Sequence, residues 1–279
     1  MKNKVNVIAE IGINHQGNMN LMKEMMIVAK RCGADYVKSQ KREPKFCLTK
    51  DQYEKPYDVP NSFGRTYGKH KEALEFSKEE WKELFEFANK NEIKLFASVF
   101  DTTSADIMNA LGSELFKIGS AEVNKLQLLE HIKSFDKPII LSTGMSTLEE
   151  IDTAVDILQG SNLTIMHCTS SYPCKEEDVN LNIIKTLRNR YSLPVGLSGH
   201  YVQGSGAIEC AAVALGAEWV ERHFTLDRTM KGSDQSSSLE AVGLERVIKS
   251  IRSVEKSMGS ENKTILECEK PARIKFKDG

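Results

Sequence analysis

The chain has 279 residues, of which 40% are hydrophobic, and its 38 Lys and Arg residues are almost balanced by 39 Asp and Glu residues. This near-neutral charge, with acidic and basic residues intermixed, argues against a nucleic-acid partner, which needs a clustered basic surface. No apolar run approaches the roughly 20 residues of a membrane span, and we expect one large domain, because α/β barrels of about this length form a single unit.

Eight short apolar runs alternate with amphipathic segments along almost the whole chain, the order typical of a parallel sheet built from βα units. The predicted strands cover residues 5–11, 34–38, 94–98, 115–118, 138–142, 163–167, 194–197 and 218–222. The predicted helices cover residues 19–32, 78–91, 103–111, 126–134, 148–158, 181–190, 205–215 and 239–258. Eight strand and helix pairs predict an α/β fold of the (β/α)8 TIM-barrel type.

Two segments depart from this alternation. Residues 41–77 are rich in Pro, Gly, Tyr and Lys and show neither the helical nor the strand period, and a loop of this length in a compact enzyme is usually a lid or a substrate loop. Residues 261–279 resemble an extension or linker without a core of its own. We therefore expect a barrel domain over residues 1–260, followed by this extension.

Polar residues stand at or just beyond the end of every predicted strand. In chain order they are Glu10, Asn14 and His15; Lys38 and Gln40; Ser98 and Asp101; Lys117, Ser120 and Glu122; Ser142 and Thr143; His167, Thr169, Ser170 and Tyr172; Ser198 and His200; and Glu221 and His223. Because parallel barrels gather the carboxyl ends of their strands at one rim, we expect these side chains to line a substrate pocket.

Two lysines, Lys38 and Lys117, end otherwise apolar strands. Buried ammonium groups need anions, and the hydroxyls of the strand-end serines would add hydrogen bonds, so this composition suits a ligand that carries a phosphate and a carboxylate. The alternative is that each lysine pairs only with a carboxylate of the rim, such as Glu10 or Glu122.

Two histidines, His200 and His223, end the last two predicted strands, 23 positions apart, about one helix-plus-strand repeat. On neighbouring strands their imidazoles would emerge side by side, and together they suit a divalent ion such as Mn, Fe, Co or Zn. Glu10 could add a direct or water-bridged contact and leave positions open for substrate, as in a catalytic site. The alternative for each histidine is a hydrogen-bonded core residue.

An ordered set of motifs in this chain resembles the sialic acid synthases, which condense phosphoenolpyruvate with an N-acyl aldose. The motifs are AEIGINH at residues 9–15, KSQ at 38–40, TYGKH at 66–70, LEFS at 74–77, FKIGSAE at 116–122, STGM at 142–145, HCTSSYP at 167–173, GLSGH at 196–200, ERHFTLD at 221–227 and KGSD at 231–234. They extend over most of the predicted barrel.

The resemblance implies a divalent metal, usually manganese, held by His200 and His223. It implies that phosphoenolpyruvate is bound by Lys38, Ser98, Lys117, Ser120, Ser142 and Ser198, and that Gln40, Tyr172 and Asp234, with Asn61 from the long loop, face the aldose. In the implied reaction, C3 of phosphoenolpyruvate attacks the metal-polarised aldehyde, water adds at C2, and phosphate leaves with C–O cleavage. We assign Glu122 to proton steering near C2 and C3, and Glu10 to positioning of metal-bound water, as hypotheses. Lys38 and Lys117 complete the expected catalytic set.

Many members of that family carry a C-terminal antifreeze-like domain that lends an arginine to the partner's site in a domain-swapped dimer. No segment of this chain is expected to supply that domain, so another group would close the site, and Arg65, Lys69 and Lys71 of the long loop are candidates. The acceptor would then be an N-acetylmannosamine-like aldose or its 6-phosphate, to which the basic loop is suited. A homodimer is expected from the resemblance alone.

Three other functions stay open at this stage. One is a related 3-deoxy-ulosonate synthase that uses a different aldose or aldose phosphate. The second is a relative that binds phosphoenolpyruvate without turnover, and the third is a barrel hydrolase with a metal-activated hydroxide, which the two lysines disfavour. The six cysteines form no C-x-x-C pair and the first residues do not resemble a signal peptide, so we expect a cytoplasmic protein with reduced thiols.

Overall fold

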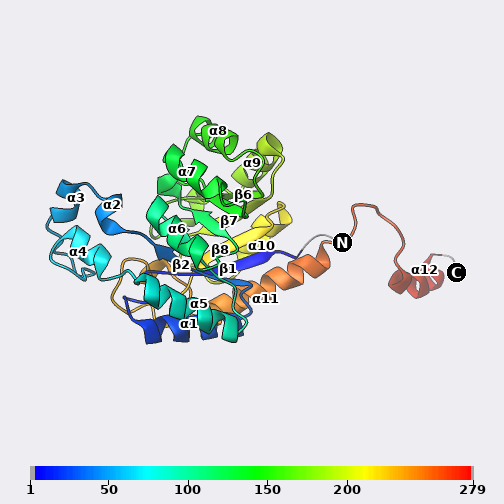
Figure 1. Ribbon diagram of the computed structural model, residues 1–279. Helices are drawn as coiled ribbons and strands as arrows, with labels where there is room; N and C mark the ends of the chain where they lie inside the picture. The colour runs from blue at the N-terminus through cyan, green and yellow to red at the C-terminus, as the bar shows by residue number, and fades with distance from the viewer. Residues whose placement is uncertain (1–3, 278–279) are drawn as a thin grey trace.

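The computed structural model describes residues 4–277, and its centre is a closed barrel of parallel strands in the order β1 to β8 (Figure 1). The strands are β1 (Asn6–Gly12), β2 (Tyr36–Lys41), β3 (Leu95–Val99), β4 (Phe116–Ile118), β5 (Ile139–Ser142), β6 (Leu163–Cys168), β7 (Val195–Gly199) and β8 (Trp219–His223). The predicted (β/α)8 barrel is confirmed. Residues 1–3 and 278–279, at the ends of the two expected segments, lie outside the described residues.

Eight longer helices surround the barrel, each after one strand. They are α1 (Met19–Arg31), α5 (Lys78–Lys90), α6 (Thr102–Ala110), α7 (Leu126–Lys133), α8 (Leu148–Ile157), α9 (Ile183–Tyr191), α10 (Ala207–Ala214) and α11 (Ala241–Ser257). Short 3-10 turns cover Ser120–Glu122, Glu176–Asp178, Gln235–Ser237 and Glu267–Glu269. Each helix buries one apolar stripe against the outward side chains of the strands, and side-chain caps such as Ser77 with Glu80 at α5 fix where several helices begin.

Inside the barrel, the strands contribute first an apolar layer and then a polar one. The apolar layer consists of Ile8, Phe96, Leu115, Ile140 and Met166, with Tyr36 and Trp219 packed against it. Successive inward side chains on a strand are two positions apart, so the next inward residues are the polar ones of the strand ends. The apolar layer therefore closes the bottom of a pocket that opens at the carboxyl ends.

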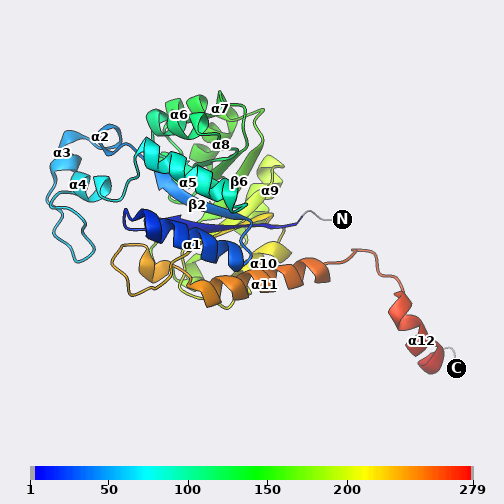
Figure 2. The same cartoon turned by 60° about the horizontal axis from the view of Figure 1, so that its bottom comes forward.

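The long segment between β2 and α5 contains helices that the sequence pattern did not predict. They are α2 (Pro44–Cys47), α3 (Lys50–Glu54) and α4 (Tyr67–Glu72), and they project beside the barrel from the end of β2 (Figures 1 and 2). The expectation that residues 41–77 form a loop without helices was wrong in this respect. Helices of four to six residues are too short to display a period, and local signals form them, such as Pro44 in the first turn of α2 and the Thr49 capping box of α3.

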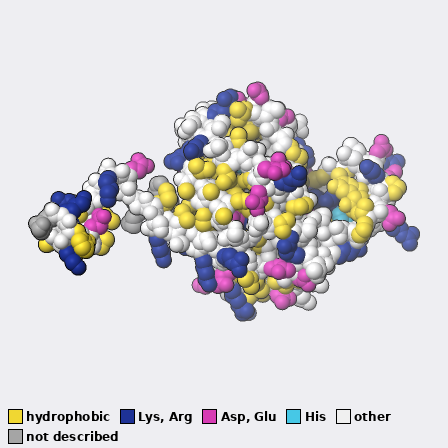
Figure 3. Space-filling view, turned by 180° about the vertical axis from the view of Figure 1, so that it is seen from behind, with side chains coloured by type: hydrophobic (Ala, Val, Ile, Leu, Met, Phe, Trp, Pro, Cys, Tyr) yellow, Lys and Arg dark blue, Asp and Glu magenta, His cyan; other side chains and the backbone are white. Residues whose placement is uncertain are grey.

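The chain after α11 leaves the barrel. All described residues after Met258 are exposed, including those of α12 (Lys270–Phe276), and Figure 3 shows apolar side chains of this tail at the left. The exposed apolar residues there are Ile265, Leu266, Ile274 and Phe276. None of the described helices has the length and apolar character that a membrane crossing requires.

Candidate active site

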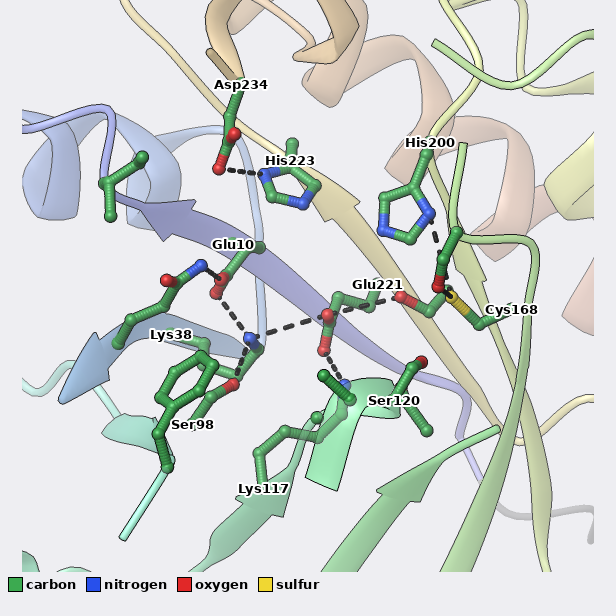
Figure 4. Close-up of a pocket in the computed structure, with 18 of the residues that line it drawn as sticks. Glu10, Lys38, Ser98, Lys117, Ser120, Cys168, His200, Glu221, His223 and Asp234 are labelled. Atoms are coloured by element: carbon green, nitrogen blue, oxygen red, sulfur yellow. Dashed lines mark hydrogen bonds and ion pairs between the residues drawn. The ribbon is translucent and has the colours of Figure 1, made fainter. Parts of the chain in front are cut away.

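A cavity of about 300 Å³ opens at the carboxyl ends of the strands, at the lower end of the size range of ligand sites, roughly 300–1,000 Å³. It is lined by Glu10, Ile13, Lys38, Gln40, Arg42, Lys71, Ser98, Phe100, Lys117, Gly119, Ser120, Ala121, Glu122, Ser142, Met145, Cys168, Ser170, Tyr172, Ser198, His200, Glu221, His223, Ser233 and Asp234. All the residues that were assigned to the donor, the aldose, the metal or catalysis line it, except Asn61. Six of the strand-end residues expected at the pocket are not in the lining: Asn14, His15, Asp101, Thr143, His167 and Thr169. Figure 4 shows that side chains from opposite strands point into this one space.

The floor of the pocket is a buried network of two lysines and two glutamates (Figure 4). Lys38 Nζ lies 2.7 Å from Glu10 Oε2 and donates to Ser98 Oγ at 2.8 Å. Lys117 Nζ donates to Glu221 Oε2 at 2.7 Å, and Lys38 reaches the other oxygen of Glu221 at 3.5 Å. Lys117 therefore pairs with Glu221 and not with Glu10 or Glu122, the carboxylates that the sequence had suggested as partners.

Burial and pairing separate the pKa values of the two glutamates. Burial favours the neutral acid, but Lys117 and Lys38 outweigh it at Glu221 and lower the pKa of that carboxyl to about 2. At Glu10 burial outweighs the attraction of Lys38 and raises the pKa to about 7. Glu221 is thus a fixed anion between the lysines, whereas Glu10 is a carboxyl that exchanges a proton near neutral pH.

Glu122 lies on the other side of the pocket, in the 3-10 turn that follows β4. Its Oε2 is buried without a hydrogen-bond partner, and Lys125 lies 3.6 Å from Oε1. Burial raises the pKa of Glu122. In the same turn, the Ser120 hydroxyl accepts a hydrogen bond from the backbone N–H of Gly144 at 3.0 Å, which ties the ends of β4 and β5 together.

The two imidazoles meet at the ends of β7 and β8, with ring centroids 5.3 Å apart. His200 Nδ1 lies 2.9 Å from the carbonyl oxygen of Thr169; a proton there leaves Nε2 with its lone pair, 3.0 Å from the Tyr172 hydroxyl. Burial lowers the pKa of His223 to about 3, so this ring is neutral, and its Nδ1 has no hydrogen-bond partner, with Asp234 Oδ2 at 3.9 Å.

This donor set fits a divalent ion. An ion about 2.1 Å from one nitrogen of each ring would leave roughly 4.5–5.5 Å between the centroids of adjacent ligands, and the observed separation lies in that range. The described residues contain no group of three or more His, Cys, Asp or Glu side chains arranged to hold a metal. The two imidazoles would therefore need water or substrate oxygens to complete the shell, as in an open catalytic site.

The residues expected to face the aldose lie at the outer part of the pocket, with one exception. Gln40, Tyr172 and Asp234 line the cavity. Asn61 is exposed and outside the lining, and its side-chain oxygen accepts a hydrogen bond from the Gly232 backbone at 3.3 Å. Its role in aldose binding stays a prediction. Its side-chain oxygen already has a partner, the backbone of Gly232, which lies two residues before Asp234 in the chain.

The three basic candidates of the long loop are separated by the structure. Arg65 and Lys69 do not line the pocket, and Lys69 is exposed and paired with Glu72 at 2.7 Å. Lys71 does line it. Only the last of the three is placed to act on a bound ligand.

Sequence reasoning gave no role to several residues of the pocket. Arg42 lines it from the end of β2, stacks on Phe100 at 3.9 Å and pairs with Glu75 at 2.9 Å. Arg42 could have been predicted if the length of β2 had been recognised, because this strand ends at Lys41 and not at residue 38. Glu221 was expected at the rim but was given no role, although the two-residue period places it on the same inward face as His223.

A closed barrel that gathers buried lysines, glutamates and two imidazoles at its strand ends defines a (β/α)8 enzyme with its site in the usual place for this fold. The model of the NeuB family matches residues 25–263. The chain therefore belongs to the NeuB family.

Named relatives agree with this assignment. The N-acetylneuraminate-9-phosphate synthase of Homo sapiens is 41% identical over 266 residues, which cover 94% of this chain and 74% of that protein. The N,N'-diacetyllegionaminic acid synthase of Campylobacter jejuni is 38% identical, covering 92% of this chain and 78% of that protein. The crystal structure of N-acetylneuraminic acid synthetase from Leptospira borgpetersenii, in complex with citrate, superposes with a TM-score of 0.86 at 32% identity and covers 99% of this chain and 92% of that one.

Proposed function

We propose that the enzyme condenses phosphoenolpyruvate with an open-chain N-acyl aldose, such as N-acetylmannosamine, to give a sialic-acid-type nonulosonate and phosphate. One observation carries the proposal: a pair of lysines and a pair of imidazoles line the same cavity. The lysines suit a small polyanion and the imidazoles suit the activation of a carbonyl. The named relatives, which make neuraminic, legionaminic and pseudaminic acids, support the product class.

The donor phosphoenolpyruvate would occupy the floor of the pocket. An ammonium group has three donors, and Lys117 donates one hydrogen bond to an oxygen, that of Glu221. The serines at the ends of β3, β5 and β7 and in the turn after β4 surround the lysines. We assign the phosphate and carboxylate of the donor to Lys38 and Lys117 with Ser98, Ser120, Ser142 and Ser198.

The aldose would lie above the donor, with its aldehyde toward the imidazoles. A divalent ion, with Mn²⁺ as our first choice, held by His200 and His223 would polarise the aldehyde oxygen. Glu10 is next to His223 in the strand register and would orient water in that region. Tyr172 and Asp234 border the same imidazoles, so they are placed to bind the hydroxyls of the sugar chain, together with Gln40.

In the proposed reaction, C3 of phosphoenolpyruvate forms a bond to the aldehyde carbon, and the aldehyde oxygen takes up a proton to become a hydroxyl. This leaves a cationic C2, to which water adds with loss of a proton. The resulting C2 hydroxyl loses its proton as the C2–O bond to phosphate breaks, which gives the ketone and inorganic phosphate. Glu122, buried with an unpartnered oxygen, is our candidate for the proton transfers at C2 and C3.

A phosphate-release assay with a panel of aldoses tests this function. With Mn²⁺ and phosphoenolpyruvate, we expect one phosphate per nonulosonate formed and none without an aldose. If phosphate were released only with a non-acylated aldose phosphate, the enzyme would be a 3-deoxy-ulosonate synthase. Binding of phosphoenolpyruvate without release for any aldose would contradict the proposal, and release without any second substrate would indicate a hydrolase.

A further inference from the structure

The outer part of the pocket contains a cation without a counter-ion. Lys71 lies in the last turn of α4 and lines the cavity. Among residues 4–277, it has no carboxylate oxygen within 4.0 Å, and its ammonium group lies 5.1 Å from the centre of the Tyr67 ring. A cation that is withdrawn from water and unpaired is costly, which is why such groups mark places where a ligand supplies the opposite charge.

The lysines and the arginine that line the pocket beside Lys71 already have carboxylate partners. Lys38 and Lys117 pair with Glu10 and Glu221 in the floor. Arg42, the second cation at the outer part, forms an ion pair with Glu75, with Nε 2.9 Å from Oε1, and its backbone N–H donates to the other oxygen of that carboxylate at 3.0 Å. The charge of Lys71 is therefore the one left for a ligand at this level of the cavity.

The neighbours of Lys71 place it on the acceptor side. The charges that act on it are those of Arg42, Asp234 and Glu75, and Arg42 in turn donates to the Gln40 side chain. Gln40 and Asp234 are the residues assigned to the aldose. The serines assigned to the donor phosphate are on the inner strand ends, below the loop that carries Lys71.

Burial supports the same assignment. Burial, followed by repulsion from Arg42, lowers the pKa of Lys71 to about 8. An anion bound beside the ammonium group would relieve both effects. Lys69, two positions earlier, offers the contrast: it is exposed and already paired with Glu72.

Resting on the proposed function, we infer that Lys71 binds an anionic group at the far end of the aldose, and that the acceptor is a sugar phosphate rather than a neutral sugar. With the aldehyde carbon at the imidazoles, the opposite end of the open chain points toward the pocket opening, where α4 projects. A phosphate ester on the terminal carbon would there meet an ammonium group that has no other anion.

The test compares N-acetylmannosamine 6-phosphate with N-acetylmannosamine in the manganese-loaded enzyme. For Lys71→Met we expect kcat/KM with the phosphorylated aldose to fall about 10- to 100-fold, the range of one hydrogen bond to a charged group. The neutral aldose and the KM for phosphoenolpyruvate should change less than about threefold. Lys71→Arg should keep most of the preference, and Lys69→Met, the matched control, should behave like the wild type.

A binding measurement keeps the inference separate from the reaction. In calorimetric titrations, the affinity of Lys71→Met for the aldose phosphate should be 10- to 100-fold lower than that of the wild type, whether or not the enzyme turns over. If affinity fell in this way but no turnover were detected in the wild type, the proposed function would be wrong and the subsite would be supported. Equal kcat/KM for the two aldoses in the wild type would defeat the subsite and leave the function standing. A Lys71→Met enzyme whose KM rose only for phosphoenolpyruvate would assign this lysine to the donor and overturn the inference.

Discussion

The inner and outer parts of the pocket are built in different ways. The inner part stands on the barrel strands, where Lys38, Lys117, Glu10 and Glu221 are buried and compensate one another. The outer part depends on the long segment between β2 and α5, where Lys71 has no carboxylate oxygen within 4.0 Å in the described part of the chain. The comparison shows a strand-end site whose charges compensate one another, and we infer that the loop provides the groups that decide which acceptor is used.

Metal removal should have the largest effect, and it acts on the inner part. Because two imidazoles are the protein ligands that we propose for the ion, we expect a chelator to abolish turnover and Mn²⁺ to restore it. His200→Ala should lower kcat by at least about 10³-fold and lower the bound manganese measured by mass spectrometry. His131→Ala, at a half-buried histidine on α7 that is outside the pocket lining, is the control. Normal metal content and turnover in His200→Ala would rule out the assigned metal site.

Replacement of a floor lysine should come next. Lys117→Met removes a donor to the anionic substrate and leaves Glu221 buried, with Lys38 at 3.5 Å and the Ser198 hydroxyl at 3.3 Å. We expect kcat/KM for phosphoenolpyruvate to fall about 10²- to 10³-fold, and the free energy of unfolding to fall by about 3 kcal/mol, because a buried charge loses its main partner. Steady-state kinetics and urea unfolding measure the two effects. Lys82→Met, an exposed lysine on α5, should change neither; a fully active Lys117→Met would contradict the role of the floor.

The smallest expected effect is a pH dependence confined to the outer part. Burial holds the pKa of Lys71 near 8, so its positive charge is present below pH 8 and is lost above it. With the phosphorylated aldose, kcat/KM should therefore fall as pH rises past 8, up to the loss seen in Lys71→Met.

The charged groups that act on Lys71 are Arg42, Asp234 and Glu75. The guanidinium of Arg42 does not titrate in this range, and burial raises the pKa of Glu75 to about 7, so Glu75 gains its negative charge below the pH at which Lys71 loses its positive charge. Lys71→Arg, whose guanidinium does not titrate, should lack the decline above pH 8. An identical decline in Lys71→Arg would show that another group causes it.

The sequence predicted the inner part because strand geometry is regular. Eight repeats of strand and helix predict the barrel. Within a strand, every second side chain points inward, so Lys38, Lys117 and Glu221 follow the inward residues of the apolar layer. The partner of each lysine could not be predicted, because the stagger of neighbouring strands decides which side chains meet: Lys117 lies in register with Ser98 and Ile140 but bonds across the barrel to Glu221.

The outer part was predicted less well because a loop has no such period. The three short helices of 41–77 were missed, Arg42 was assigned no role, and Asn61 lies outside the cavity lining. For the group that closes the site, the sequence offered three basic candidates, and Lys71 is the one of them that lines the cavity. The homodimer, the cytoplasmic location and the metal identity stay predictions from the sequence.

The origin of the oxygen in the released phosphate tests the central claim most directly. Phosphoenolpyruvate labelled with ¹⁸O at the bridge between C2 and phosphorus is turned over with Mn²⁺ and an N-acyl aldose, and both products are analysed by mass spectrometry. We predict that the label appears in inorganic phosphate, since water adds at C2 and the C2–O bond breaks. Label retained in the nonulosonate, or labelled phosphate released without any aldose, would contradict the account.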